Sequence, residues 1–364
     1  MKKLRVGVIG TGMAFERLHH PAYTELQDKY EFKALCDQDV SKAREWAKKL
    51  NIPEQNVYSN YRDMIKNPEL DMFDIMVPIG ENFKVTEEVA KAGKPIICEK
   101  PLAPNVEQAK AHRELPKKYD IPIMIAENYR YNEEINLIRD MLRTEKVGKP
   151  VYFIQNRVMN FPSDMWGSKF AAREWRQHPG FPGGVILDTA VHDIAALHHF
   201  FGAVDEVHAY GMPQDDEFAP YAVITANIKF KSGIIGQFVF YCAGQEIQRP
   251  LVGLRIFCTD GEIYLEERDC GTINTAYNDG RSEQISYRPQ RGFYNELLNF
   301  YDAAIGKEPI SVTPEMEYGD AKMIFDMLKS IKEGRAVKVD DEFEFTPEYA
   351  RQQGDTAQPP GYLM

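Results

Sequence analysis

Short apolar runs rich in β-branched residues alternate with helix-like stretches through the first third of this 364-residue chain. An apolar run without polar alternation predicts a strand that is buried on both faces. Strands of this kind separated by helices predict a parallel, doubly wound α/β sheet. The strands predicted in this way cover residues 4–9, 31–36, 73–77, 95–98 and 121–126.

The pattern changes beyond about residue 128. Strand-like runs then follow one another, and the turn signals at 231–233 and 260–261 predict a mostly antiparallel sheet. We therefore expect two domains, 1–127 and 128–364, the second an α+β domain whose last residues, 352–364, form an extended tail. Helices are predicted in this part at 133–143, 187–201, 293–305 and 314–333.

Charge and cysteine content narrow the class of protein. The formal net charge of −11 argues against a general nucleic-acid binder, because phosphate affinity comes from clustered Lys and Arg. No run approaches the ~18 apolar residues of a membrane span, and the N-terminus is typical of a first strand rather than a secretion signal. Five cysteines without a C-x-x-C pair predict free thiols and a cytoplasmic location.

No metal site is expected. The adjacent pairs His19–His20 and His198–His199 are the only neighbouring histidines in the sequence. Adjacent side chains on a helix point about 100° apart, so each pair is interpreted as packing or surface residues.

A glycine turn follows the first predicted strand. Gly10 allows the tight turn, and Gly12 lets the backbone approach a pyrophosphate. The helix that begins around Met13 and Ala14 offers backbone N–H groups to the anion. Phe15 stands where the G-x-G-x-x-G fingerprint has its third glycine, so the motif is imperfect.

An acid, Asp37, ends the second predicted strand. A carboxylate there accepts hydrogen bonds from the adenosine ribose and repels a 2′-phosphate, which favours NAD over NADP. Lys42 and Arg44 lie close enough in sequence to keep NADP open. The alternative is that Asp37 only caps a loop.

Five further motifs occur in a characteristic order. They are Val77-Pro78 with Asn82, Cys98-Glu99-Lys100-Pro101-Leu102, Asn128-Tyr129-Arg130-Tyr131-Asn132, Trp175-Arg176, and Gly183-Gly184 followed by Asp188-x-x-x-His192. With the glycine turn, this order and spacing resembles the Gfo/Idh/MocA family of oxidoreductases along nearly the whole chain.

The resemblance implies an N-terminal Rossmann domain, a C-terminal domain with a large open antiparallel sheet, and hydride transfer between a nicotinamide and a sugar or polyol. It implies Lys100, Asp188 and His192 as catalytic residues. Beside the glycine turn and Asp37, it implies cofactor-side roles for Pro78, Asn82, Glu99, Lys100, Arg130, Trp175 and Arg176.

The chain also departs from the family pattern. Val85 stands where a His is common, Val185 replaces a third glycine, Ala190 replaces the Gly of D-x-G, and Ala195 replaces an Asp, although Asp193 is adjacent. These changes alter the pocket wall and put the identity of the substrate in doubt.

Oxidation of a secondary alcohol needs a proton acceptor and a donor to the developing oxyanion. His192 is the expected base, and Asp188, four residues earlier, lies on the same helix face and binds substrate or orients the imidazole. Lys100 either donates to the reacting oxygen or is itself the base. The alternatives are a solvated lysine and a core histidine.

Aromatic residues gather in the segment 161–166 and at Trp175 and Phe181. Such rings suit a glycoside, or they belong to a loop packed over the sheet. The leading hypothesis is an NAD-dependent dehydrogenase acting at a secondary hydroxyl, by the resemblance at C3, of a sugar, polyol or glycoside. The alternatives are an NAD-dependent glycoside hydrolase that oxidises C3 transiently, and a sugar and NAD sensor without turnover.

A homo-oligomer is expected through the second sheet. The run 221–230 is apolar on both alternating faces, with Tyr221 and Val223 on one and Ala222 and Ile224 on the other. A strand that is apolar on both faces fits a sheet covered by helices on one side and by another subunit on the other.

Overall fold

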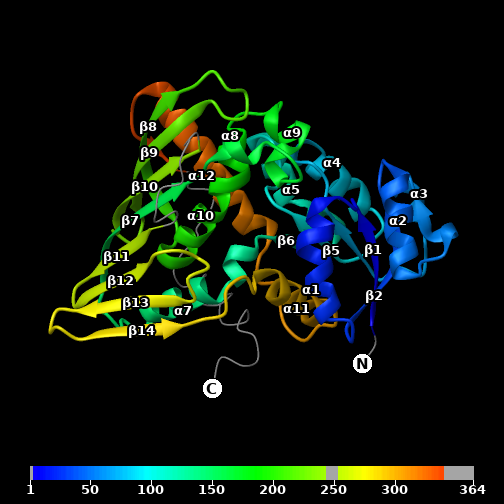
Figure 1. The fold of residues 1–364 in the computed structure, drawn as a ribbon, viewed down its shortest axis with the longest axis horizontal. Helices are drawn as coiled ribbons and strands as arrows, with labels where there is room; N and C mark the ends of the chain where they lie inside the picture. The colour runs from blue at the N-terminus through cyan, green and yellow to red at the C-terminus, as the bar shows by residue number, and fades with distance from the viewer. Residues whose placement is uncertain (1–2, 243–252, 340–364) are drawn as a thin grey trace. The chain divides into compact units, whose positions relative to one another are not determined.

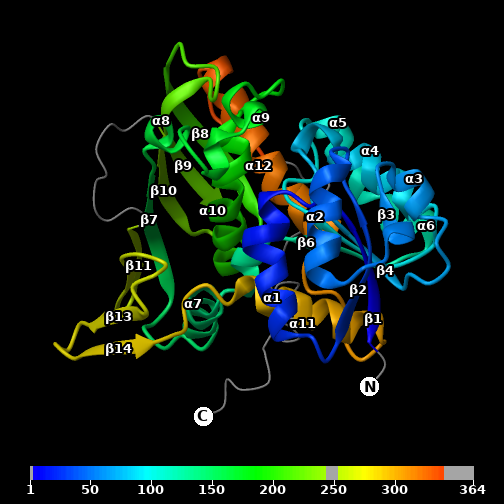
Figure 2. The same ribbon diagram turned by 45° about the vertical axis from the view of Figure 1, so that its right-hand side comes forward.

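A computed structural model describes residues 3–242 and 253–339 of the chain (Figures 1 and 2). The predicted tail at 352–364 lies outside the described residues. The chain divides into two compact units, one running to Asn128 and taking in Phe293–Tyr318, the other running over Tyr129–Gly292 and onward from Gly319. The first unit therefore includes a later segment that was expected in the second domain.

The first unit is built on a six-stranded parallel sheet in the order β3-β2-β1-β4-β5-β6. The prediction of a doubly wound parallel sheet is confirmed. Only the short β3 was not predicted, because two residues are too few to give an apolar run. The strands are β1 (Leu4–Ile9), β2 (Tyr30–Cys36), β3 (Val57–Tyr58), β4 (Met72–Ile75), β5 (Ile96–Glu99) and β6 (Ile123–Ala126).

Helices connect these strands and flank the sheet (Figure 1). The first begins with a π-helical turn, η1 (Phe15–His19), and continues as α1 (His20–Glu25). The others are α2 (Val40–Leu50), α3 (Tyr61–Met64), α4 (Ile79–Ala90), α5 (Val106–Arg113) and α6 (Leu115–Tyr119). Parallel strands expose their carboxyl ends at one edge, which is where ligands bind in such sheets.

The later segment that joins the first unit contains most of α11 (Gly292–Ala304). The hydroxyl of Tyr30 donates to the carbonyl of Leu297 at 2.5 Å, and the N–H of Ile125 donates to the carbonyl of Val312 at 3.1 Å. These bonds connect both β2 and β6 to residues almost 200 or more positions away, a pairing that local sequence patterns do not reveal.

The second unit is built on a nine-stranded sheet in the order β14-β13-β12-β11-β7-β10-β9-β8-β15. It is mostly antiparallel, as predicted, with one parallel pairing between β7 and β10. The strands are β7 (Pro150–Val158), β8 (Val204–Pro213), β9 (Tyr221–Phe230), β10 (Ile235–Tyr241), β11 (Leu254–Cys258), β12 (Gly261–Leu265), β13 (Thr272–Tyr277), β14 (Ser282–Ser286) and β15 (Val337–Lys338).

Three helices cover one face of this sheet (Figure 2): α7 (Glu133–Arg143), α10 (Val185–Phe201) and α12 (Pro314–Glu333). Apolar residues of these helices and of the inward strand positions form one core. In β9, Ile224 belongs to that core and Ala222 is buried, while the alternating positions Tyr221 and Val223 are only partly buried. The short helices α8 (Phe161–Asp164) and α9 (Glu174–Gln177) precede α10.

Two sequence-level expectations concern the whole chain. All five cysteines lie within the described residues and are free. In the described stretches, no helix combines the length and apolarity needed to cross a membrane.

Candidate active site

The glycine turn joins β1 to the helix that begins at Met13. Gly10 has φ +96°, and a Cβ there would stand 2.1 Å from the carbonyl oxygen of Met76, so a side chain is excluded. At Gly12, apart from the adjacent residues of the chain, no described atom lies within 4 Å of the position a Cβ would take. The turn therefore has a tight side toward the sheet and an open side over Gly12, and it fits a dinucleotide pyrophosphate.

Phe15 occupies the third position of the fingerprint and is fully buried. Its ring packs edge-on against Phe32 and Trp46, with centroids 5.4 Å and 5.0 Å away. An aromatic cluster thus separates helix from sheet where the fingerprint uses glycine for close packing. The imperfect motif has a packing cause and leaves the turn itself intact.

Asp37 follows the end of β2 and is bound to the glycine turn. Its Oδ2 accepts hydrogen bonds from the backbone N–H of Thr11 at 2.8 Å and from the Thr11 hydroxyl at 3.0 Å. Asp37 is partly exposed, so capping the loop and contacting a ribose are compatible. The two nearby cations are both paired with acids, Lys42 with Asp39 at 3.7 Å and Arg44 with Glu54 at 2.6 Å.

Lys100 lies directly after β5, before a cis peptide bond to Pro101. The side-chain amide of Asn82 donates to the carbonyls on both sides of it, at 2.5 Å to Glu99 and 2.8 Å to Pro101. Asn82 is fully buried, and its Oδ1 accepts from the thiol of Cys98 at 3.2 Å. Asn82, expected on the cofactor side, directs its side chain to the backbone around Lys100.

Glu99 links Lys100 to a buried polar group that the sequence reading missed. One Glu99 oxygen accepts from the backbone N–H of Lys100 at 3.1 Å, and the other lies 3.1 Å from Nε2 of His19. His19 Nδ1 lies 2.9 Å from Oδ2 of Asp74. Asp74 is an acid inside an otherwise apolar strand, and a buried carboxylate requires partners. This residue could have indicated the buried group from the sequence.

Asp188 and His192 lie one turn apart on α10, as their spacing predicts. The helix begins after Gly184, where φ is +50° and a Cβ would stand 2.1 Å from the carbonyl oxygen of Phe218. Asp188 is nearly buried and accepts a hydrogen bond from Nε of Arg176 at 2.7 Å. The Arg176 guanidinium also lies 4.1 Å from the ring centroid of Trp175. Arg176 and Trp175, both expected on the cofactor side, thus form a group with Asp188, the expected catalytic carboxylate.

The ring of His192 stacks on the ring of Tyr129, with centroids 4.2 Å apart and planes at 11°. The Tyr129 hydroxyl accepts from Nη2 of Arg157 at 2.8 Å, and Arg157 Nε donates to Asp193 at 2.9 Å. Burial lowers the pKa of Arg157, but Asp193 and Tyr129 outweigh burial and raise it overall. The Arg268 guanidinium lies 4.3 Å from the Tyr129 ring centroid. His192 is therefore held by a buried aromatic and cationic group.

Arg130, expected on the cofactor side, binds an acid of its own unit. The residue is 1% exposed, and its Nη2 binds the carboxylate of Asp320 at 2.6 Å within the second unit. His198 contacts the same carboxylate. The charge of Arg130 is neutralised in the core of the unit, so this placement does not support a contact with the cofactor.

Two other features predicted from the sequence are Pro78 and the aromatic segment 161–166. Pro78 caps the N-terminus of α4 and is exposed. In the aromatic segment, Phe161 packs on Phe218 with centroids 5.2 Å apart, while Trp166 is 78% exposed. The segment is thus anchored in the core at one end and open at the other. Lys100 belongs to the first unit, and Asp188 and His192 belong to the second.

Two family models match the chain. Residues 4–126 match the oxidoreductase family with an NAD-binding Rossmann fold, and residues 135–264 match the GFO/IDH/MocA C-terminal domain. The first unit therefore contains an NAD-binding Rossmann domain.

Relatives of known sequence span almost the whole chain. An uncharacterized protein of Saccharomyces cerevisiae is 29% identical over 93% of this chain and 99% of its own length. Myo-inositol 2-dehydrogenase of Thermotoga maritima is 25% identical over 93% of this chain and 99% of its own. Levoglucosan dehydrogenase of Pseudarthrobacter phenanthrenivorans is 24% identical over 93% and 91%.

Solved structures share the fold. An oxidoreductase of Thermotoga maritima superposes with a TM-score of 0.83 at 24% identity, covering 93% of this chain and 99% of that one. Levoglucosan dehydrogenase in complex with NADH and L-sorbose gives a TM-score of 0.82 at 21% identity, covering 93% and 100%. An oxidoreductase of Agrobacterium radiobacter in complex with NAD+, L-tartaric acid and magnesium gives 0.81 at 18%, covering 93% and 99%.

Proposed function

Because the chain belongs to the GFO/IDH/MocA family of oxidoreductases, we propose that it is an NAD-dependent dehydrogenase acting on a secondary hydroxyl of a sugar, polyol or glycoside. The observation that carries the proposal is the pair Asp188 and His192, one turn apart on α10, with Asp188 bound to Arg176 and His192 stacked on Tyr129. The dehydrogenase relatives support the sugar-like substrate class.

The glycine turn and Asp37 would hold the cofactor. The open side of the turn at Gly12 suits the pyrophosphate, and the partly exposed Asp37 suits the adenosine ribose. Lys42 and Arg44 are both paired with acids, which supports NAD rather than NADP. When bound, NAD supplies the acceptor for the hydride.

The chain's own residues handle the proton and orient the substrate. His192, as neutral imidazole, accepts the hydroxyl proton, and the stack on Tyr129 fixes the plane in which its nitrogens can act. Asp188, oriented by Arg176, accepts a hydrogen bond from a neighbouring substrate hydroxyl. Lys100 donates a hydrogen bond to the reacting oxygen in this scheme. In the alternative, Lys100 accepts the proton and His192 donates to the oxygen.

The proposal is tested by assaying the purified protein with NAD+ against myo-inositol, D-glucose, levoglucosan and aryl β-D-glucosides, following NADH. Lys100→Ala and His192→Ala are expected to reduce turnover by about 100-fold or more while leaving the Kd for NAD nearly unchanged. His178→Ala is the matched control, because His178 is exposed and pairs with Glu217. Unchanged turnover in both test variants would refute the proposal.

A glycoside substrate is favoured by aromatic residues in the segment that precedes α10. Trp175 packs on Arg176, which binds Asp188, and Trp166 offers an exposed ring. Oxidation at C3 is proposed for such a substrate. A hydrolase that oxidises C3 only transiently would release free sugar from the aryl glucosides without accumulating NADH. A sensor would bind NAD and sugar without turnover.

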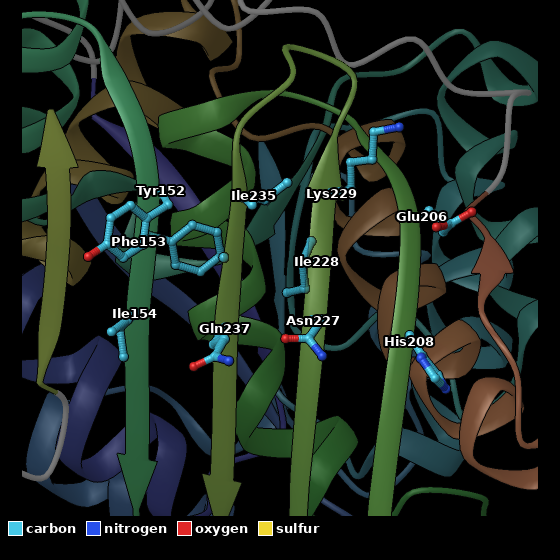
Figure 3. A pocket seen from close by; sticks show the side chains of 11 residues that line it. Tyr152, Phe153, Ile154, Glu206, His208, Asn227, Ile228, Lys229, Ile235 and Gln237 are labelled. Atoms are coloured by element: carbon cyan, nitrogen blue, oxygen red, sulfur yellow. The ribbon is translucent and has the colours of Figure 1, made fainter. Parts of the chain in front are cut away.

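The protein is further proposed to self-associate through the open face of the nine-stranded sheet. A hollow of about 460 Å³ runs across β7, β10, β9 and β8 on this sheet (Figure 3). Tyr152 and Ile235 there are 39% and 56% exposed, and Asn227 and Lys229 add polar groups. A mixed apolar and polar face of this kind fits a second copy of the chain.

Sedimentation of Ile235→Arg tests this association. A cation in the middle of the face is expected to shift the protein toward monomer. Ile305→Arg is the matched control, because Ile305 is 46% exposed but lies in the first unit. A wild-type monomer at micromolar concentration would contradict the proposal.

A further inference from the structure

We propose that His19 is a positioning residue for Lys100: it bridges the carboxylates of Asp74 and Glu99, and through Glu99 it fixes the peptide N–H of Lys100 at the end of β5. The importance of Lys100 rests on the function proposed above. The bridge itself rests on contacts within the first unit.

The contacts form a continuous chain. Asp74 Oδ2 lies 2.9 Å from His19 Nδ1, and His19 Nε2 lies 3.1 Å from Glu99 Oε1. The other oxygen of Glu99 accepts from the Lys100 N–H at 3.1 Å. His19 makes one contact with each ring nitrogen, and Glu99 makes one contact with each carboxylate oxygen. A change at His19 therefore reaches Lys100 through Glu99.

The bridge requires a charged imidazole. Each ring nitrogen of His19 faces a carboxylate, and both can donate only when both carry a proton. His19 and Asp74 are fully buried. Burial opposes the charge on His19, but Asp74 and Glu99 outweigh burial and raise its pKa well above its ordinary value. Its two acidic partners therefore favour the doubly protonated form of His19, which can donate from both ring nitrogens.

Other groups around the bridge come from neighbouring elements. The hydroxyl of Tyr23 on α1 donates to Asp74 Oδ2 at 3.0 Å. Glu296 on α11 is fully buried, and burial, together with Glu99, Asp74 and Glu127, raises its pKa well above the ordinary range in spite of the opposing charge of His19. The acids that contact the His19 ring directly are Asp74 and Glu99.

The local backbone explains why His19 reaches the interior. His19 ends the π-helical turn η1, whereas His20, the next residue, begins α1 and packs over Trp46 with centroids 4.8 Å apart. A π-turn holds one more residue than a regular turn and changes the direction of the side chains that follow it. His19 is fully buried, and His20 is partly exposed.

A second group holds the same peptide. Asn82 binds the carbonyls of Glu99 and Pro101, on both sides of Lys100. The backbone at Lys100 is thus held through its N–H by Glu99 and through the flanking carbonyls by Asn82. Without His19, Glu99 faces buried Asp74 without the intervening positive charge, so we expect Glu99 to turn away and release the N–H.

Hydrogen exchange measured by mass spectrometry tests the bridge directly. In His19→Gln, the Lys100 amide is expected to exchange at least about tenfold faster than in wild type. Amides of β1 and β6 are expected to keep their exchange rates, because the proposed effect is local to Lys100. Faster exchange throughout the sheet would instead indicate that His19 only stabilises the fold. His20→Gln is the matched control and should leave the Lys100 amide unchanged.

A turnover arm uses the sugar from the panel above that is oxidised fastest. His19→Gln is expected to lower kcat by about 10- to 100-fold, since a small misplacement of a catalytic group has an effect of this size. In a Lys100→Gln background the same change should have no further effect. Equal losses in both backgrounds, or an unchanged exchange rate for the Lys100 amide, would overturn the inference.

Failure of the inference can be told apart from failure of the proposed function. If Lys100→Gln alone leaves turnover unchanged, the role of Lys100 is wrong, while the exchange result still decides the bridge. If His19→Gln does not fold by circular dichroism, Glu99→Gln breaks the bridge from its more exposed end. That variant is expected to release the Lys100 amide in the same way, and a protected amide would contradict the inference.

Discussion

The imidazole of His192 lies nearly parallel to the phenol ring of Tyr129, with centroids 4.2 Å apart. The stack gives Tyr129 two separable tasks: its ring supports His192, and its hydroxyl accepts from Arg157. Tyr129→Phe keeps the ring and loses the hydroxyl, whereas Tyr129→Ala loses both.

We expect Tyr129→Phe to lower kcat by a few fold and Tyr129→Ala to lower it by about 100-fold, because a ring that supports a catalytic base controls its position. Steady-state rates with the best panel substrate check this order. Tyr131→Phe is the control, because it removes the hydroxyl of another buried tyrosine in the same motif. Equal losses in the two Tyr129 variants would show that the ring has no separate role.

Asp37 is expected to determine the preference between NAD and NADP. Asp37→Asn keeps an acceptor for the Thr11 N–H but removes the negative charge that repels a 2′-phosphate. The ratio of kcat/KM for NAD to that for NADP should fall by about tenfold or more. Glu45→Gln removes an exposed acid of α2 that pairs with Lys49, away from the glycine turn, and should leave the ratio unchanged. An equal change of this ratio in both variants would mean that the preference follows the net charge of the region and not Asp37 itself.

Glu134 on α7 makes stability depend on pH. It is 1% exposed, both carboxyl oxygens are without a hydrogen-bond partner in the described structure, and burial raises its pKa to about 7. The unfolded chain releases this proton near its ordinary value of 4.5. Because the folded pKa is the higher one, the contribution to the free energy of unfolding is complete below about pH 4.5 and is lost as the pH rises through 7.

Glu134→Gln is neutral at every pH and should therefore match wild type near pH 4.5 and exceed it above pH 7. The gain expected there is on the order of 3 kcal/mol in the free energy of unfolding. Denaturant titrations at the two pH values measure it. Glu133→Gln, at the partly exposed neighbour, is the matched control.

The cysteines should react in a definite order with a thiol reagent. Chiefly through burial, the pKa values of Cys36 and Cys242 rise to about 12. At Cys270, partial burial raises the pKa, but hydrogen bonds to the backbone and to Tyr287 outweigh it, and the net shift is downward. Cys270 is also exposed. We expect one fast-reacting thiol, lost in Cys270→Ser; a fast phase that persists there would identify another residue.

The parts that could be predicted from sequence depend on short-range patterns. The apolar runs of β1, β4, β5 and β6 and the four-residue spacing of Asp188 and His192 are local, and the structure reproduces them. The acid after β2 was also found, and it lies against the glycine turn.

The parts that could not be predicted depend on contacts between distant residues. His19 meets Asp74 and Glu99 across 55 and 80 positions, and a histidine on a helix gives no sign of such partners. The family resemblance implies a cofactor-side role for Arg130, but its guanidinium binds the carboxylate of Asp320, 190 positions away. The parallel pairing of β7 with β10 likewise has no local signal.

The return of residues 293–318 to the first unit has a consequence for biosynthesis. A nascent chain that has reached Asn128 contains all six strands of the Rossmann sheet but not Leu297 and Val312, the partners of Tyr30 and Ile125. The nucleotide-binding half therefore completes its packing only after the ribosome has made the intervening 164 residues, Tyr129–Gly292. Packing of the Rossmann unit is in this way delayed until every strand of the second sheet except β15 has been synthesised.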